Sequence, residues 1–526
     1  MTQPVTTRGV RSVPELLLPA GSFDAAIAAI DGGADALYFG FASFSARKQA
    51  RNFDPVDYRR LLRHARQRGI RLYVTLNTIV LERELEEISR LLVFLSRFPP
   101  DALIVQDWGL VRLVRDRFPA LALHASTQMA VQTPEAASLA AELGVSRIVL
   151  PRESSLATLR RFAAALPSME FEVFVHGALC YSFSGLCLAS GTLLGRSGNR
   201  GECAQVCRSY YNAPGDGERS ESSYWFSCKD LNLAARVAEL ADAGAASLKV
   251  EGRMKAPEYC YSVAQLYRGM LDRLAGEGPD DEELARRDCA ARIAFARSPT
   301  EAWLFARGGQ DMIDAQYPGH RGALAGRIVE SGGGRIVVDL ESRLGLRDGL
   351  LMFEAGDPRR PLPFAVTGLC DARTGREIVQ ARPGMRVELE CPASAPTGSE
   401  LRRISAREQD RRRPSPEEYA PERQALDGDL RIGTEGLSLH IRAPLFPGAG
   451  RNEIDIAPGE QLDLQRSRRP GGLLDALSVF SESGDADFVL VPHLVGGEVA
   501  LPGRDAHSEN VELAALFIPP SRLKRE

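Results

Sequence analysis

Four cysteines stand close together in the middle of the 526-residue chain, with the spacing Cys180-x6-Cys187-x15-Cys203-x3-Cys207. Cysteine thiolates hold iron–sulfur clusters, and four of them from one segment can enclose a cubane core. The stretch between them is rich in glycine, which lets a backbone fold tightly around a bulky inorganic group. Zinc is the alternative, but structural zinc prefers cysteine pairs about two to four residues apart, and only Cys203 and Cys207 have such a spacing. The spacing therefore favours an iron–sulfur cluster over zinc.

Polar residues that could do chemistry recur where short apolar runs end. Lys249, Glu251 and Arg253 alternate, so in a strand with a period of two all three point to one side. Three charged groups cannot face an apolar core unless they are paired or solvated. They predict either a buried ion network that ties the last strand to the first, or a site for an anionic cofactor or an RNA phosphate. We predict catalytic roles for His124, Gln128, Arg152, Glu251 and Arg253, and ligand-binding roles for Asn77, His176 and Lys249.

The elements that must position these residues are short apolar runs separated by amphipathic helical patterns. Strand-to-helix alternation predicts right-handed βαβ units, and eight strands within about 250 residues fit a (β/α)8 barrel of the TIM type. An open, doubly wound sheet is the alternative, but the polar residues lie at the strand ends, where a barrel carries its chemistry. The eight runs are residues 16–20, 36–40, 71–77, 102–107, 121–127, 147–153, 171–177 and 247–253.

The chain is long enough for two or three domains, and the pattern of predicted elements changes along the sequence. We expect the barrel in residues 1–285, with the cysteines in an insertion at 178–246 between the seventh and eighth strands. Short strands with Gly-rich turns in 286–405 predict a small β-barrel. Residues 406–526 are expected to hold a linker and a C-terminal α+β segment. The charged stretch 402–416 is interpreted as a linker or solvated helix, with an RNA-contacting strip as the alternative.

Composition and charge narrow the class of protein. The chain carries a net charge of −4, with 44% hydrophobic and 25% charged residues, which is ordinary for a globular protein. It has no basic excess typical of a dedicated nucleic-acid-binding domain, although a local basic patch would suffice for an RNA substrate. We find neither a run long enough for a membrane span nor a secretory signal, and expect a cytoplasmic protein. In a reducing cytosol, clustered cysteines favour metal binding or catalysis over disulfides.

The segments around the cysteines resemble the signature of peptidase family U32. Residues 174–187 (FVHGALCYSFSGLC), 199–208 (NRGECAQVCR) and 247–255 (SLKVEGRMK) carry this resemblance, and residues 14–22 (PELLLPAGS) resemble the family's opening. The resemblance covers roughly residues 14–350. Further stretches resemble most closely the branch that hydroxylates a cytidine of large-subunit ribosomal RNA, namely 75–78 (TLNT), 103–107 (LIVQD) and 123–128 (LHASTQ). Sister branches hydroxylate a tRNA wobble uridine or act in oxygen-independent ubiquinone synthesis.

The resemblance implies a 4Fe-4S cluster and a hydroxylation that needs no dioxygen. In the RNA branches, prephenate or a related metabolite is the implied oxygen donor. The implied partners are a ribosomal or transfer RNA and the iron–sulfur assembly machinery, with a homo- or heterodimer also compatible. Tyr181 and Phe183, between the first two cysteines, are interpreted either as stacking surfaces for a base or as packing around the cluster.

Three other functions remain as alternatives. The family name implies a peptidase, but a cysteine protease needs a thiolate activated by an aligned base, and we find no such motif and no Gly-x-Ser-x-Gly elbow. Hydroxylation of a ubiquinone precursor would call for an apolar cleft. A non-catalytic cluster protein is the third alternative, and the polar residues at the strand ends argue against it.

Two features depart from the family pattern. Cys228 stands directly before Lys229 and Asp230, where relatives carry a residue that is not a ligand. It is interpreted as a buried structural thiol, with a spare metal ligand as the alternative. Relatives in the ribosomal RNA branch continue beyond the position that matches 519–526, so we expect a C-terminal module to be missing and substrate capture to be affected.

Overall fold

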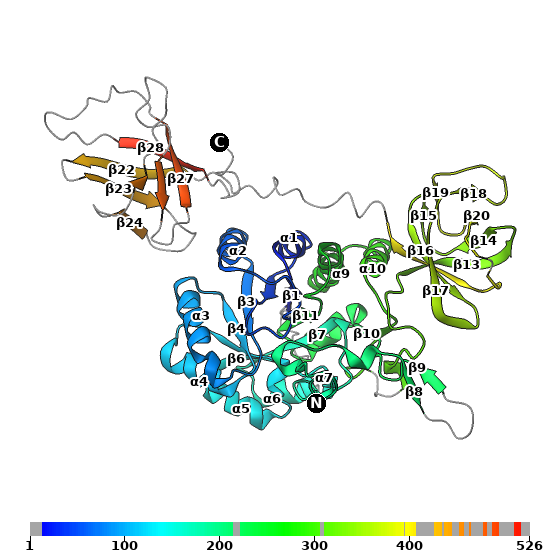
Figure 1. The fold of residues 1–526 in the computed structure, drawn as a ribbon, viewed down its shortest axis with the longest axis horizontal. Helices are drawn as coiled ribbons and strands as arrows, with labels where there is room; N and C mark the ends of the chain where they lie inside the picture. The colour runs from blue at the N-terminus through cyan, green and yellow to red at the C-terminus, as the bar shows by residue number, and fades with distance from the viewer. Residues whose placement is uncertain are drawn as a thin grey trace, which may run out of the picture. The chain divides into compact units, whose positions relative to one another are not determined.

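The computed structural model describes residues 13–213, 221–305, 310–393 and 395–406, together with the strands between residues 425 and 516. The chain divides into two compact units, Met1–Arg413 and Pro414–Glu526. The first unit holds the barrel, the cysteine-rich insertion and a later antiparallel sheet (Figure 1). No helix in this described part of the chain has the length and apolar character needed to cross a bilayer.

Eight parallel strands close into a barrel in the first unit. Each strand pairs with the next, and β11 completes the ring by pairing with both β1 and β7. The predicted (β/α)8 barrel is therefore confirmed, and the open doubly wound sheet was the wrong alternative. The strands are β1 (Glu15–Pro19), β2 (Ala36–Phe39), β3 (Arg71–Leu76), β4 (Ala102–Val105), β5 (Leu123–Ala125), β6 (Val145–Val149), β7 (Glu170–Ala178) and β11 (Ser247–Val250).

Helices alternate with these strands and cover the outside of the barrel. Many begin at a short polar residue whose side chain accepts a hydrogen bond from the first turn, as Ser22, Asp54, Thr133 and Ser155 do. The barrel helices are α1 (Phe23–Asp31), α2 (Pro55–Gln67), α3 (Leu85–Arg97), α4 (Trp108–Arg117), α5 (Pro134–Glu142), α6 (Leu156–Ala165), α8 (Val237–Asp242) and α9 (Pro257–Ala275).

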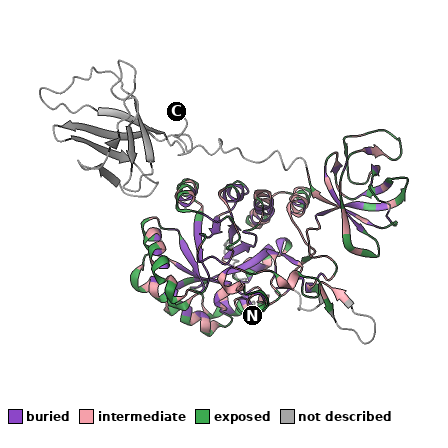
Figure 2. Ribbon diagram, in the orientation of Figure 1, coloured by how far each residue is buried: buried purple, intermediate pink, exposed green. Residues whose placement is uncertain are grey.

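Successive residues of the strands serve two different cores, because side chains alternate across a strand. Leu16 and Leu18 are fully buried in the large cluster between the strands and the helices. Leu17, between them, belongs to a small cluster inside the barrel with Tyr73 and Ile104. Burial on both faces gives the near-continuous apolar runs that predict parallel strands, and Figure 2 shows the strands buried while the helices expose their outer faces.

The cysteine-rich insertion joins β7 to β11. It contains α7 (Ala189–Leu194), the short hairpin β8 (Tyr211–Ala213) and β9 (Glu221–Ser223), and β10 (Asp230–Asn232). Strand β10 pairs antiparallel with the end of β7, Leu231 opposite Gly177, and so extends the sheet beyond the barrel wall. Two elements follow the barrel, α10 (Asp281–Ala294) and β12 (Pro299–Thr300), and β12 pairs with β10.

The region for which a small β-barrel was predicted holds a seven-stranded antiparallel sheet, in the order β17-β16-β21-β13-β14-β20-β18. A two-stranded ribbon, β15 (Leu344–Gly345) with β19 (Gln380–Ala381), accompanies it. The strands of the seven-stranded sheet enclose a separate apolar core that includes Ile336, Leu350 and Leu401. The sheet consists of β13 (Ala323–Gly332), β14 (Arg335–Leu340), β16 (Gly349–Glu354), β17 (Asp357–Ala365), β18 (Leu369–Asp371), β20 (Arg386–Glu390) and β21 (Glu400–Ser405).

The second unit contains another seven-stranded sheet, in the order β24-β23-β22-β28-β27-β26-β25. The described residues of this unit form strands only, so the helices of the predicted α+β segment have no counterpart among them. Residues 407–424 of the predicted linker and residues 519–526 lie outside the described residues. The strands are β22 (Ala425–Gly433), β23 (Gly436–Ala443), β24 (Asn452–Ile456), β25 (Leu462–Asp463), β26 (Leu477–Phe480), β27 (Ala486–His493) and β28 (Asn510–Leu516).

Candidate functional site

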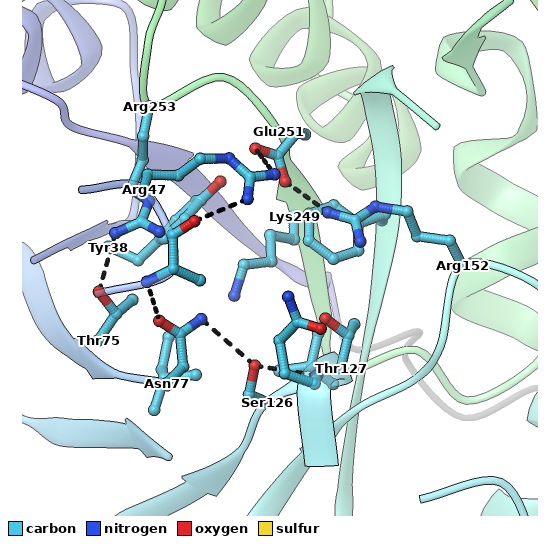
Figure 3. Close-up of a pocket in the computed structure, with 15 residues that line it drawn as sticks. Tyr38, Arg47, Thr75, Asn77, Ser126, Thr127, Arg152, Lys249, Glu251 and Arg253 are labelled. Atoms are coloured by element: carbon cyan, nitrogen blue, oxygen red, sulfur yellow. Dashed lines mark hydrogen bonds and ion pairs between the residues drawn. The ribbon is translucent and has the colours of Figure 1, made fainter. Parts of the chain in front are cut away.

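A cavity of about 380 Å³, counted out to its opening, lies at the C-terminal ends of the barrel strands (Figure 3). Six of the eight polar residues predicted from the strand ends line it: Asn77, Gln128, Arg152, Lys249, Glu251 and Arg253. Five further polar residues of its wall had no predicted role, although Ser126 and Thr127 lie in a polar strand-end stretch of the sequence: Tyr38, Arg47, Thr75, Ser126 and Thr127. Because a barrel gathers its strand ends at one face, residues far apart in the sequence meet here.

Glu251 holds two arginines at the cavity wall. Its carboxylate lies 2.5 Å from Arg152 Nη2 and 3.2 Å from Arg47 Nη2. Burial raises the pKa of this carboxyl, but the charges of Arg47, Arg152 and Arg253 outweigh burial and hold the pKa at about 2. Glu251 is therefore an anion at every physiological pH and orients the guanidinium groups beside it.

Arg253 also lines the cavity and is 5% exposed. Its Nη1 donates to Ser45 Oγ at 2.6 Å and to Thr75 Oγ1 at 2.9 Å. Within the described residues, no carboxylate forms an ion pair with it. Burial, helped by the charge of Arg47, lowers the pKa of Arg253 to about 10. Three guanidinium groups thus face the cavity with one carboxylate among them, which suits an anionic ligand.

Lys249 belongs to a different layer, deeper in the barrel. Its Nζ lies 2.7 Å from Glu172 Oε1 and 4.3 Å from the centre of the Tyr38 ring. Glu172 also pairs with Arg147, which reaches Glu15 on β1 at 2.5 Å. Burial lowers the pKa of Lys249, whereas Glu172 opposes that shift. Lys249 therefore joins an ion network that links β1, β6, β7 and β11, while Glu251 and Arg253 turn to the cavity.

His124, predicted as catalytic, lies below the cavity rather than in its wall. It occupies the middle of the three-residue strand β5 and packs edge-on against Tyr73, with 4.8 Å between ring centres. Its Nδ1 is buried and finds no hydrogen-bond partner among the described residues. Burial, helped by the charge of Arg147, lowers the pKa of the imidazole to about 3. The ring is therefore neutral and enclosed, and its contacts belong to the barrel interior.

His176, predicted to bind a ligand, faces away from the cavity because of a bulge in β7. A regular strand would turn it to the same side as Phe174, two residues earlier. The register with β11 shifts here, so that Phe174 pairs with Lys249 but His176 pairs with Val250. His176 consequently packs against Tyr267 of α9, with 5.6 Å between ring centres, and burial lowers its pKa to about 4.

The buried neutral state of His124 predicts a specific pH dependence of stability. Its pKa is about 3 in the folded chain and about 6.5 when unfolded, so between these values the unfolded chain binds the extra proton. The contribution of neutral His124 to the free energy of unfolding is fully present above the unfolded pKa and is lost as the pH falls toward the folded pKa. Between pH 7 and pH 5, the free energy of unfolding measured in urea should fall by about 2 kcal/mol more for wild type than for His124→Gln. Parallel losses in both proteins would contradict this assignment.

The cysteine segment packs directly over the cavity mouth. Ser184 Oγ accepts a hydrogen bond from the Arg152 backbone at 3.4 Å and donates to Glu153 Oε2 at 2.9 Å. Gly185 has φ +78°, and a Cβ there would stand 2.3 Å from the backbone oxygen of Gln128. Only glycine allows this close approach at a positive φ. The segment between the first two cysteines is thereby held against two residues that line the cavity.

The four clustered cysteines are free thiols, with Cys203 exposed and the other three half-buried. Burial raises the pKa of Cys180 and of Cys207, and the charges of the other thiols of the cluster raise both further. Four thiol donors are soft ligands of the kind that hold iron–sulfur clusters. The described residues hold no group of three or more Cys, His, Asp or Glu side chains arranged as a closed metal site. Burial raises the pKa of Cys228 to about 12.

A (β/α)8 barrel with a cysteine-rich insertion over the mouth of a cationic cavity is the class of protein that the fold and the site define. A sequence model of peptidase family U32 matches residues 21–314, more than half of the chain. The chain therefore belongs to peptidase family U32, and the resemblance noted in the sequence is confirmed.

Three curated relatives illustrate the range of the family. The Escherichia coli 23S rRNA 5-hydroxycytidine C2501 synthase is 41% identical over 313 residues, which cover 59% of this chain and 46% of that protein. A Helicobacter pylori tRNA hydroxylation protein P is 35% identical over 271 residues, covering 49% of this chain and 64% of the relative. A Porphyromonas gingivalis collagenase is 27% identical over 420 residues, covering 77% and 97%. The chain thus spans about half to two thirds of the length of the two RNA-related relatives.

Proposed function

We propose that this protein is an iron–sulfur-dependent, oxygen-independent hydroxylase of a pyrimidine base in RNA. The observation that carries the proposal is the cation-rich cavity at the barrel mouth, beneath the four-cysteine segment. Two relatives are named for hydroxylation of ribosomal and transfer RNA, and both support an RNA substrate. A ribosomal RNA cytidine is the first candidate because the relative that is 41% identical is named for it. Such a protein would act in the cytoplasm, with the iron–sulfur assembly machinery as a partner.

Cys180, Cys187, Cys203 and Cys207 would hold a 4Fe-4S cluster, which would supply electrons or polarise a bound oxygen donor. The remaining chemistry falls to the residues of the cavity. Arg253 and the pair Arg47 and Arg152 would bind an anionic oxygen donor, for which prephenate or a related carboxylate is a suitable candidate. Guanidinium groups match a carboxylate with two parallel hydrogen bonds, and Glu251 keeps two of them in place.

The target base must leave its stack to reach this cavity. Gln128 offers a side-chain amide that makes no hydrogen bond within the described residues, so it is available to the edge of a base. Asn77 is less free, because its oxygen accepts from the Ala46 backbone at 3.0 Å and its nitrogen lies 3.4 Å from Ser126 Oγ. We assign Asn77 to shaping the wall and Gln128 to contact with the substrate.

The collagenase relative keeps a peptidase as the second candidate. Peptide hydrolysis by a serine or threonine needs a base within hydrogen-bond reach of the hydroxyl. Among the described residues that line the cavity there is no histidine, and Ser126 Oγ already accepts from the Gln128 backbone at 3.2 Å. A ubiquinone precursor would call for an apolar cleft, whereas this wall is mostly charged and polar. A non-catalytic cluster protein leaves the cavity unexplained.

Mass spectrometry of ribosomal and transfer RNA from a strain that lacks the gene tests the proposal. One pyrimidine should lose the mass of a single oxygen atom, and expression of the wild-type chain should restore it. Unchanged RNA in the deletion strain would contradict the proposed function. Cleavage of a collagen peptide by the anaerobically purified protein would favour the peptidase instead.

The Arg253→Lys variant tests the anion-binding role. Lysine keeps the charge but loses the planar fork, so restoration of the modified base should fall about tenfold or more. The midpoint of urea unfolding should fall only modestly, because the substitution affects the two hydrogen bonds to Ser45 and Thr75 but breaks no ion pair among the described residues. Full restoration of the modification by Arg253→Lys would rule out a bidentate anion contact.

A further inference from the structure

Large aromatic side chains stand exposed beside the cavity, on the cysteine-rich insertion. Tyr181 is 54% exposed, Tyr210 47%, Phe226 38% and Trp225 36%. Exposed rings that gather on one surface of a folded chain mark a binding face more often than scattered single residues do. The rings come from three separate segments, residues 181, 210–211 and 224–226. We refer to these rings together as the aromatic surface, which consists of Tyr181, Tyr210, Tyr211, Tyr224, Trp225 and Phe226.

Ring contacts order the aromatic surface. Phe226 packs edge-on against Tyr181 at 5.1 Å and against Tyr211 at 5.3 Å between ring centres. Tyr210 packs in the same way against Tyr224, at 5.0 Å. Two hydroxyls are fixed by the backbone, Tyr210 Oη by Ser222 O and Tyr211 Oη by Val206 O. In each edge-to-face pair one ring covers a single face of the other, so the remaining faces stay available for stacking.

The aromatic surface adjoins the proposed entrance for the base. Tyr181 follows Cys180 directly and precedes Ser184 and Gly185, which pack on Arg152 and Gln128 of the cavity wall. A nucleotide chain whose target base enters the cavity would therefore pass its neighbouring nucleotides over these rings. Tyr181 links the two regions, because it packs against Phe226 of the aromatic surface and belongs to the segment that packs on the cavity wall.

Positive charge accompanies the rings. Of the three arginines in residues 178–213, Arg200 pairs with Glu84 and Arg208 lies 3.9 Å from Asp230, whereas Arg196 has no ion pair within the described residues. The backbone of Lys229, three residues after Phe226, donates to Met312 O at 2.7 Å, while its side-chain ammonium has no hydrogen bond or ion pair within the described residues. Rings combined with basic residues match a single-stranded nucleic acid, whose bases stack and whose phosphates are anionic.

We propose that the aromatic surface binds the unpaired nucleotides that flank the target base, by stacking. This inference rests on the proposed function in that the strand is RNA. It names the partner as single-stranded RNA, since a continuous duplex offers no free base faces to the rings. Trp225 and Phe226 provide the main stacking faces, and Lys229 contacts a phosphate.

Fluorescence anisotropy with a short fluorescein-labelled single-stranded RNA tests the inference on the full chain. Wild type should bind the single strand more tightly than a duplex of the same length. Trp225→Ala and Phe226→Ala should each weaken binding roughly tenfold, whereas Trp225→Phe should stay near wild type. Lys229→Gln should lower the slope of log affinity against log salt concentration by about one, as expected for the loss of one phosphate contact. Leu139→Ala, at a 50% exposed position on α5, is the matched surface control.

Binding by Trp225→Ala and Phe226→Ala at wild-type affinity, with unchanged melting temperatures, would overturn the inference. Loss of a co-purifying polypeptide from these variants, with RNA binding intact, would also overturn it and make the surface a protein interface. The RNA mass spectra separate this inference from the proposed function. If wild type restores no oxygenated base but the variants still lose RNA affinity, the hydroxylase fails and the aromatic surface stands. If both variants restore the base fully and bind RNA normally, the hydroxylase stands and the role of the aromatic surface fails.

Discussion

Cys187→Ser protein, purified without oxygen, is expected to lose its iron and its ability to restore the hydroxylated base to background. A serine oxygen is a poor substitute for a soft thiolate, and a cubane held by four ligands does not survive the loss of one in a partly exposed site. Iron and sulfide analysis, visible absorbance and RNA mass spectrometry measure the two effects. The same loss is expected at Cys180, Cys203 and Cys207.

Cys228→Ser is the matched control for this prediction. Cys228 is 1% exposed, whereas the four clustered cysteines are half-buried or exposed, so we assign Cys228 to packing. Its serine variant should therefore keep both iron and activity. Colourless wild-type protein that holds one zinc ion would contradict the cluster, and loss of iron in Cys228→Ser would make this residue a ligand.

The largest effect on stability is expected from Glu172→Gln. Glu172 is 0% exposed and pairs with Lys249 at 2.7 Å and Arg147 at 3.2 Å. Removal of its charge leaves the buried Lys249 without its ion-pair partner and takes one of three carboxylates from Arg147, which costs about 3–5 kcal/mol. Urea unfolding followed by circular dichroism measures the loss.

Glu170→Gln is the control, two residues earlier on the same strand. Glu170 pairs with the same Arg147 at 2.7 Å, but its side chain is 50% exposed. Water screens such a pair, so its loss should cost about 0–1 kcal/mol. Equal losses in both variants would show that burial does not govern this network.

Much of the barrel could be predicted because burial on both faces leaves a direct trace in the sequence. Each of the eight apolar runs overlaps one barrel strand, and the polar residues that follow several strands meet at the cavity. Arg47 was missed because it lies in the loop after β2, where no periodic pattern draws attention to a single arginine. A search for cations in every loop that follows a strand would have found it.

The positions of the two histidines could not be predicted from the local sequence pattern. His124 was placed at a strand end, but β5 is only three residues long and ends one residue later, so its ring stays one layer below the mouth. His176 was also placed by its position near a strand end, but a bulge turns its ring away from the cavity. Depth along a short strand and a register shift both depend on the neighbouring strands, and neither leaves a local signal in the chain.

The late position of β11 determines the order in which the site can be completed during synthesis. Ser247 Oγ donates to Glu15 across a separation of 232 residues, and the pairing of β11 with β1 closes the ring. Contacts of such long range form late, because the loop between them must be closed first. A chain made from its N-terminus therefore releases all four cysteines from the ribosome before the strand that carries Glu251 and Arg253. The cysteine segment is translated beside an open barrel, and the anion-binding wall arrives last.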